Sequence, residues 1–376
     1  MADPNIDALN ATTLKEIYPR VVRDVFFKNS PFLAYVRNNI TPWSGGVSTD
    51  QTFIYDALIG GAYAKGQTFN LTKPETLAAT TFVPKFYEVN ITEYLEDVEV
   101  FNKGPQAVFS RVDLDMTNAM NTLNAIIAIA LWRHGQGSVA SYISDDRSLH
   151  TNGIAEALNN GTDPSWDGNI FTTYGGQTRN GAISSVLNSI PKWCGDSNGA
   201  AGEISYNLLE EGYQDACRGN LEPNLMVANK GIIAYIKERL EAKQRLTQET
   251  DPIYGATGFR FNKCMVLKDD YAPSATYGEN NAKLGNFLTS TFTSPSSPST
   301  RSGLPASTSC TVGEVLFMLN TDTWDFRVSD SPLYQFGFTG FKEQPDSTRV
   351  AGQMLAALTA ICRDPQLNKQ FYGINS

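Results

Sequence analysis

Hydrophobic and polar residues alternate in two segments near the start of the chain. An alternation of period two is typical of β-strands. Pro84, within the second segment, indicates an edge strand, because proline has no N–H to donate to a neighbouring strand. The glycine- and threonine-rich stretch between the segments predicts a long tip, so we expect a protruding two-stranded ribbon within residues 49–100. The alternating positions are Phe53, Tyr55, Ala57 and Ile59 in the first segment and Val83, Tyr87, Val89 and Ile91 in the second.

A two-stranded ribbon of this kind is only marginally stable in water by itself. It presents unpaired backbone edges and exposed aromatic side chains, which are typical of a surface that another protein covers. The ribbon is therefore expected to need a partner.

A helical pattern follows the ribbon, with apolar residues mostly four positions apart. Gly104 and Pro105 indicate its start, since proline suits the first turn, and Gly135 is placed where a C-terminal cap is expected. Residues 105–134 at 1.5 Å per residue predict a rod of about 45 Å with one apolar side. The apolar positions are Val108, Val112, Met116, Met120, Leu123, Ile127 and Leu131.

The second half of the chain alternates between helical and strand patterns. Segments 206–219 and 230–245 predict helices, the second capped by Asn229, and "PNLMVAN" predicts a short buried strand between them. "GFRFNKCMVLKDDY" predicts a hairpin, and "GEVLFMLNTDTWDFRVS" predicts two strands. "TRVAGQMLAALTAIC" fits either a strand or a helix. The Ser/Pro-rich residues 289–309 predict an exposed mobile loop.

The composition excludes several classes of protein. The 376 residues carry a net charge of −9 with 18% charged residues and no basic run, which argues against tight binding to nucleic acid but is compatible with lying beside packed DNA. The five scattered cysteines predict buried thiols in a reducing cytoplasm, with no disulfide framework or zinc site. Neither a signal peptide nor a membrane span is predicted, so we expect a soluble protein made in the cytoplasm, with no membrane partner.

Structural roles explain the residues with catalytic potential better than catalysis does. His134 near the end of the long helix complements the helix dipole, and His150 is expected in a surface turn. The pair Asp269 and Asp270 predicts a solvated turn, and the pair Glu210 and Glu211 a helix surface. "YGGQTRNG" lacks the lysine and the spacing of a nucleotide-binding loop. The chain is therefore predicted not to be an enzyme, and to have no catalytic site, cofactor or metal.

Aromatic residues are concentrated in an N-terminal arm, in the ribbon and in "SPLYQFGFTGFKEQ" (residues 331–344). The aromatic set from Trp324 to Phe341, with Phe326 in it, is expected to pack both within the subunit and against neighbours, and Gly337 and Gly340 to let the backbone bend. Together these segments predict a subunit that buries its apolar surface only in an assembly. The candidate contacts between subunits are Phe26, Phe27, Phe32, Tyr35, Phe53, Tyr55, Tyr63, Lys65, Phe69, Phe82, Phe86, Tyr334, Phe336, Phe338 and Phe341.

The order of arm, ribbon and long helix is followed by "YNLLEEGYQDACRGNLEPNLMVANKGIIAYIKERLEAKQR", "GATGFRFN", "KDDYAP", "VLFMLNTDTWDFRVSDSPLYQFGFTGFKEQPDSTRVAGQ" and "DPQLNKQFYG". In these features the sequence resembles the major capsid proteins of tailed double-stranded DNA bacteriophages, over nearly the whole chain. The resemblance implies an α+β Hong Kong 97-type fold and self-assembly into hexamers and pentamers of an icosahedral head. The parts that it implies are an N-arm (1–48), an E-loop (49–100), a peripheral domain (101–199) with spine helix 105–134, a mostly axial domain (200–340) with loop 289–309, and a return to the peripheral domain (341–376).

The resemblance also implies partners and a location. The partners would be other copies of the chain, a separate scaffolding protein, a portal protein at one vertex, a decoration protein, and double-stranded DNA packaged without sequence-specific binding. The protein would be located in the virion capsid after synthesis in the cytoplasm of a bacterial host. Two alternatives stay open: an encapsulin-like shell that encloses enzymes, and an α/β hydrolase or carbohydrate-active enzyme with an atypical site.

Overall fold

The computed structural model of the chain describes most of its residues. The described residues are 30–54, 58–73, 76–96, 111–136, 149–159, 161, 170–179, 196–202, 204–241, 248–250, 255, 257–272, 314–343 and 348–374. The N-terminal arm before residue 30 and the predicted loop 289–309 lie outside them.

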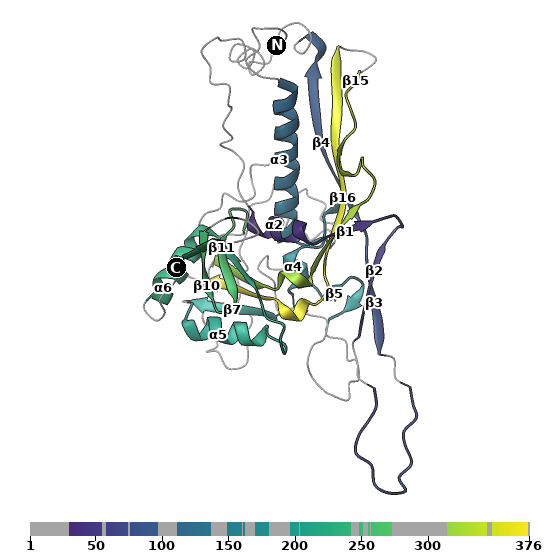
Figure 1. Cartoon of the computed structure of the whole chain (residues 1–376), viewed down its shortest axis with the longest axis vertical. Helices are drawn as coiled ribbons and strands as arrows, with labels where there is room; N and C mark the ends of the chain where they lie inside the picture. Colours follow the sequence, from purple (N-terminus) through teal and green to yellow (C-terminus); the bar gives the residue numbers. More distant parts are fainter. Residues whose placement is uncertain are drawn as a thin grey trace.

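A seven-stranded sheet forms the body that is labelled with α5 and α6 in Figure 1. Helices α5 (Tyr206–Asp215) and α6 (Lys230–Glu241) pack with one face of this sheet into a core that includes Leu209, Ile232 and Met318. The predicted hairpin forms as β10 and β11, and "PNLMVAN" forms the buried strand β8. In spatial order the strands are β7 (Asp196–Gly202), β17 (Lys369–Ile374), β12 (Glu314–Leu319), β8 (Leu225–Ala228), β11 (Cys264–Lys268), β10 (Thr257–Phe261) and β9 (Gln248–Thr250).

Asn229 precedes α6 as predicted, but its side chain does not cap the helix. Its Oδ1 atom is buried and has no hydrogen-bond partner, whereas its backbone carbonyl accepts from the N–H of Ile233. The predicted side-chain cap is therefore wrong, and this bond is the first of the helix's own ladder.

A second, six-stranded sheet is built around one long strand, β16 (Arg349–Cys362). The apolar stretch that fitted either a helix or a strand is thus a strand, because it pairs along its whole length. β4 runs antiparallel along one side of it from Lys85 to Tyr94. The other strands are β13 (Trp324–Ser329), β14 (Gln335–Phe338) and β15 (Lys342–Glu343), which pair with β16, and β1 (Ile40–Trp43), which runs parallel to β13.

Helix α3 (Arg111–Trp132) lies beside β4 and β16, and together they project above the body (Figure 1). The predicted apolar positions from Leu123 onward are buried, but so are Ala125, Ile126 and Ile129 on the other sides. The second half of the helix is therefore buried all round. Near its end, Trp132 packs against Phe317 of β12 with ring centroids 5.0 Å apart, which joins the two sheets in one core.

Gly135 follows the long helix as predicted but has a different role from the predicted cap, because its φ is not positive. A Cβ atom there would be 2.6 Å from the carbonyl oxygen of His150. The glycine therefore lets two backbone segments approach closely.

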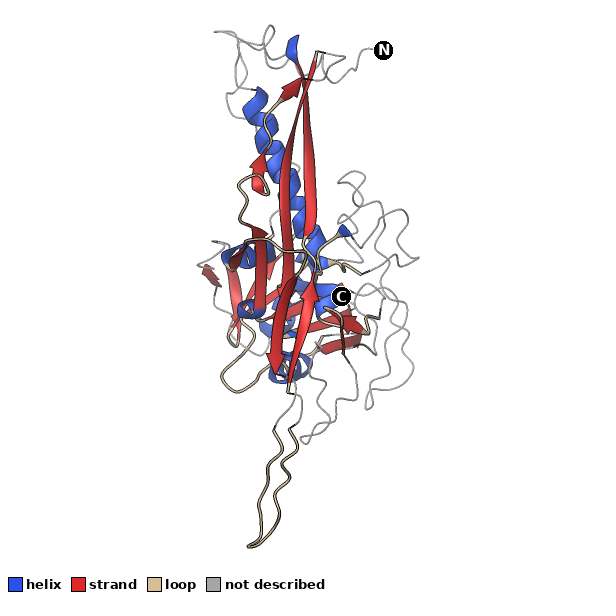
Figure 2. Cartoon of the chain, turned by 90° about the vertical axis from the view of Figure 1, so that its right-hand side faces the viewer, coloured by secondary structure: helices blue, strands red, loops and turns tan. Residues whose placement is uncertain are grey.

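The ribbon is shorter than predicted. β2 (Thr49–Ile54) pairs antiparallel with β3 (Leu77–Phe82), and residues 58–73 form the long tip between them. β4 does not belong to this hairpin, because Pro84 interrupts the chain after β3 and the next ten residues pair with β16. Figures 1 and 2 show the hairpin projecting from the body in the direction opposite to α3.

Candidate subunit-contact surfaces

The hairpin exposes apolar side chains along its whole length. Tyr63 and Phe69 are 67% and 61% exposed and pack edge to face with ring centroids 5.1 Å apart, so the tip presents a paired aromatic unit to solvent. Leu71 is 91% exposed. The other exposed apolar residues of the hairpin are Ile54, Leu58, Ile59 and Leu77. Contiguous exposure on this scale is typical of a protein–protein contact.

The tip also has a simple charge pattern. Residues 58–73 contain Lys65 and Lys73 and no carboxylate, although the whole chain is acidic. The tip is therefore a cationic and apolar projection from an acidic protein, which favours an acidic and apolar partner surface.

A second apolar surface lies at the root of the hairpin, and we refer to it as the root patch. It consists of Val83, Phe86, Leu333 and Tyr334. Phe86 is 67% exposed, and its ring lies edge to face against Tyr334 with centroids 6.0 Å apart. Glu88 is exposed two positions further along β4, on the same face of the strand as Phe86, so the root patch has an acidic neighbour.

The predicted contact residues fall into four groups. Tyr63, Lys65, Phe69, Phe86 and Tyr334 are exposed on the hairpin tip and the root patch. Phe53, Phe336, Phe338 and Phe341 are partly buried against the chain's own core. Phe26, Phe27 and Tyr55 lie outside the described residues. Phe32, Tyr35 and Phe82 are buried.

The buried group was wrongly predicted. Phe32 packs between Trp132 and Trp324, with ring centroids 5.1 and 5.5 Å away, and Phe82 packs on Tyr174 at 5.1 Å. These rings are covered within the subunit because α2 (Pro31–Asn38) and the end of β3 lie against the main core. Sequence spacing does not reveal which aromatic rings of a segment are covered in this way.

The aliphatic residues of the tip were missed. Leu58 and Leu71 are more than half exposed, yet only aromatic residues and one lysine of the tip were predicted as contacts. The sequence feature that indicates these exposed residues is the run "LIGGAYAKGQTFNLTK". Its apolar residues occur among glycine and polar residues with neither the period of a helix nor that of a strand.

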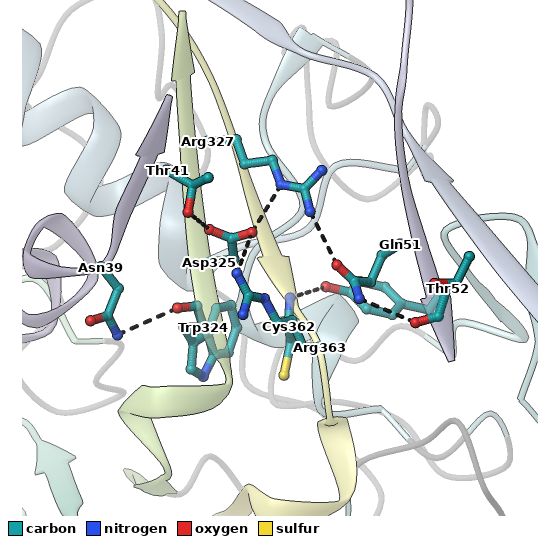
Figure 3. Close-up of polar contacts among 10 residues, drawn as sticks. Asn39, Thr41, Gln51, Thr52, Trp324, Asp325, Arg327, Cys362 and Arg363 are labelled. Atoms are coloured by element: carbon teal, nitrogen blue, oxygen red, sulfur yellow. Dashed lines mark hydrogen bonds and ion pairs between the residues drawn. The ribbon is translucent and has the colours of Figure 1, made fainter. Parts of the chain in front are cut away.

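A polar network lies where β2 meets the six-stranded sheet (Figure 3). Asp325, on β13, accepts hydrogen bonds from Thr41 Oγ1 at 2.6 Å and from Arg327 Nε and Arg363 NH2, each at 2.9 Å. Arg327 NH2 in turn donates to Gln51 Oε1 on β2 at 3.1 Å. Burial alone would raise the pKa of Asp325, but the hydrogen bonds from Thr41, Arg363 and Arg327 bring it below its ordinary value.

No protein-family model and no curated protein matches the sequence. Solved structures do match along nearly the whole chain. The cyanophage A-1(L) capsid asymmetric unit covers 96% of this chain and 98% of its own at 10% identity, with a TM-score of 0.63. The capsid of the native GTA particle covers 99% of each chain at 9% identity, with a TM-score of 0.57. The encapsulin of the holo-SrpI complex from Synechococcus elongatus PCC 7942 covers 100% of this chain and 97% of its own at 8% identity, with a TM-score of 0.54.

The chain has the Hong Kong 97-type fold. The predicted α+β fold class is thereby confirmed. At these identities the likeness concerns the fold and not the function, and it extends to a phage capsid and to an encapsulin alike.

Within the Hong Kong 97-type fold, the residues with catalytic potential are engaged in ring packing and hydrogen bonds that stabilise the fold. The prediction of a surface turn for His150 is wrong, because its ring is buried 6.0 Å from that of Tyr87. His134 is also buried, with its ring 5.0 Å from that of Phe171. Glu210 lies on the surface of α5 as predicted and accepts from Asn262 Nδ2 at 2.9 Å.

The prediction of a solvated turn is also wrong for Asp269. Its carboxylate is buried and accepts from Ser30 Oγ at 2.8 Å and from the N–H groups of Tyr271 and Phe32 at 2.8 and 3.4 Å. Asp269 thus ties the start of α2 to the end of β11. Only Asp270 reaches solvent, where it pairs with Lys268 at 3.1 Å.

Within the described residues no three His, Cys, Asp or Glu side chains are grouped to hold a metal ion, and no helix has the length and apolar character needed to cross a bilayer. Of the five cysteines, Cys217, Cys264 and Cys362 are free thiols, and the last two are buried.

Proposed function

We propose that this chain is the major capsid protein of a tailed bacteriophage, which assembles through hexamers and pentamers into an icosahedral shell around double-stranded DNA. The observation that carries the proposal is the projecting hairpin, whose apolar and cationic tip the chain's described body leaves uncovered (Figure 1). The Hong Kong 97-type fold, which the structure shares with phage and GTA capsids, supports it.

The positions of the two exposed surfaces favour assembly in rings. The tip points away from the body (Figure 1), whereas the root patch begins at Val83, directly after β3, at the other end of the same hairpin. One copy therefore does not cover its own root patch with its own tip, and each copy needs a neighbour. A head-to-tail contact of this kind closes into a ring when the rotation between neighbours allows it.

The parts of the fold are assigned accordingly. We propose that hairpin β2–β3 is the E-loop, that α3 is the spine helix of the peripheral domain with the six-stranded sheet, and that the seven-stranded sheet with α5 and α6 is the axial domain. The expected return of residues 341–376 to the peripheral domain would then apply to β16 alone, because β17 belongs to the seven-stranded sheet and the chain's end would lie in the axial domain.

The further partners follow from this role. A scaffolding protein would act during assembly, a portal protein would occupy one vertex, and a decoration protein would bind the assembled shell. The acidic chain would face the packaged DNA without gripping it, since the net charge of −9 offers no attraction to phosphate.

An encapsulin-like shell around enzyme cargo is the second candidate, and the match with the encapsulin of the holo-SrpI complex supports it. Negative-stain microscopy of the purified full chain tests shell formation. Hexamers, pentamers or closed particles are expected, and a chain that stays monomeric would overturn both candidates. DNA that is resistant to added nuclease inside particles from infected or induced cells would support the capsid, whereas a protein cargo without DNA would favour the encapsulin.

A further inference from the structure

The hairpin is connected to the body by segments that do not fix its direction. β2 and β3 form a separate two-stranded sheet that shares no ladder with either large sheet in the described part of the chain. Gly45 and Gly46, with φ of 123° and 108°, precede β2, and Val83 and Pro84 follow β3. A hairpin held only by these connections would change its angle to the body freely.

One side of the hairpin root is held by a small turn. The N–H of Thr81 donates to the carbonyl of Gly175 at 2.9 Å, and Gln177 Nε2 donates to the carbonyl of Ala79 at 2.7 Å. Gly175 fits here only as glycine, because a Cβ atom would be 2.7 Å from the side chains of Thr80 and Phe82. These contacts fix β3 to the strands β5 (Thr173–Tyr174) and β6 (Gln177–Thr178).

The other side of the root is held through Arg327. The guanidinium group uses Nε for Asp325 and NH2 for Gln51, so the buried carboxylate determines the direction in which the guanidinium points (Figure 3). Thr41 and Arg363 orient the same carboxylate from β1 and from the segment after β16. Three segments of the six-stranded sheet therefore converge on one hydrogen bond to β2.

We propose that Arg327, oriented by Asp325, is the positioning residue that holds the hairpin at its angle to the body through Gln51. Charge-assisted hydrogen bonds in a partly buried site are stronger than neutral ones, and Arg327 presents a planar donor set of fixed direction. A hairpin so held would meet its neighbour at one angle, which would make the curvature of the particle uniform. The uniform curvature rests on the proposed shell function, whereas the positioning of the hairpin by Arg327 does not.

The test compares Gln51→Leu, which removes the acceptor, with Gln51→Glu, which keeps one. Gln214→Leu on the exposed face of α5 is the matched control, because it makes the same change far from the hairpin. Hydrogen–deuterium exchange is measured on the full-length subunit for the peptide that contains Thr81. The Thr81 N–H donates to Gly175 and not to β2, so its exchange reports separation of the hairpin from the body.

We expect exchange at Thr81 to rise roughly three- to tenfold in Gln51→Leu, as suits the loss of one charge-assisted hydrogen bond, and to stay near the wild-type rate in Gln51→Glu and Gln214→Leu. Equal rates in all four proteins would overturn the proposal. A rise that extends equally to α3 and β16 would also overturn it, since it would indicate general destabilisation.

Electron microscopy of the assembled particles supplies the second readout. Gln51→Leu particles are expected to vary more in diameter than wild-type particles, and a uniform diameter would overturn the consequence for curvature. If the wild-type chain stays monomeric, the shell function fails, and the exchange rates still decide whether Arg327 holds the hairpin.

Discussion

At the scale of single residues, Asp269 couples the stability of the fold to pH. Burial raises the pKa of Asp269 from 3.8 to about 7, although the hydrogen bonds from Ser30, Tyr271 and Phe32 act in the opposite direction. The unfolded chain exposes the carboxyl group and returns its pKa to the ordinary value. Between about pH 4 and pH 7 the folded state therefore binds more protons than the unfolded state, so the contribution of Asp269 to stability falls as the pH rises through this interval.

We predict that Asp269→Asn makes stability depend less on pH. The urea midpoint of the dissociated subunit is to be measured at several values between about pH 4.5 and pH 7.5. The urea midpoint of the wild type should fall as the pH rises through this interval, and the variant should lack this fall. Asp270→Asn is the control, because Asp270 is only half-buried and pairs with Lys268. A variant slope identical to that of the wild type would contradict the role of Asp269.

Gly153 is a residue whose small size the fold requires. A Cβ atom at this position would be 2.2 Å from the carbonyl oxygen of Arg133, directly after α3, and 2.5 Å from that of Leu131 in its last turn. We predict that Gly153→Ala lowers the free energy of unfolding by about 3 kcal/mol, because backbone atoms cannot rotate away as a side chain can. Chemical denaturation of the dissociated subunit measures it. Gly60→Ala should change stability by less than about 0.5 kcal/mol, since nothing lies within 4 Å of that position.

At the scale of elements, the hairpin tip should contribute to assembly and not to folding. We predict that Tyr63→Ser or Phe69→Ser reduces particle yield strongly and leaves the melting temperature of the dissociated subunit nearly unchanged, because both rings face solvent in the single chain. Leu221→Ser removes an equally exposed apolar side chain elsewhere and should leave the yield unchanged. If the tip variants assemble as well as Leu221→Ser, the tip is not a contact.

The root patch is the expected receiver of the tip, and a double substitution tests the pairing. Phe86→Ser alone should reduce particle yield, since Phe86 is exposed beside Tyr334. We predict that Tyr63→Ser with Phe86→Ser costs little more assembly free energy than either change alone, because residues in direct contact are not additive. The extent of assembly at several protein concentrations measures it. Fully additive costs would place the two rings in separate contacts.

At the scale of the whole molecule, the exposed hairpin predicts that assembly stabilises the subunit. Anything that binds the folded state and not the unfolded one raises the apparent stability. We predict that calorimetry records a higher melting temperature for intact particles than for the dissociated subunit under the same solution conditions. Equal melting temperatures would contradict a shell whose contacts bury the tip and the root patch.

Much of the architecture could be predicted from the sequence, because period and chain order are local properties. The alternation that begins at Phe53, the spacing of apolar residues in α3 and the α–β–α succession around "PNLMVAN" each indicate an element without reference to the rest of the chain. The exposed residues Tyr63 and Phe69 could be found in the same way, since the ribbon that bears them has too few strands to cover them.

The tertiary structure alone decided which residues share a surface. Phe32 and Phe86 are the same residue type in similar sequence surroundings. Phe32 is nevertheless buried between Trp132 and Trp324, whereas Phe86 is exposed to solvent. The partner of β4, the burial of Asp269 and the convergence of Asp325, Arg327 and Gln51 all join positions far apart in the chain. Sequence periodicity describes how one segment divides into faces, whereas packing determines what each face meets, and that depends on distances between segments that no local pattern contains.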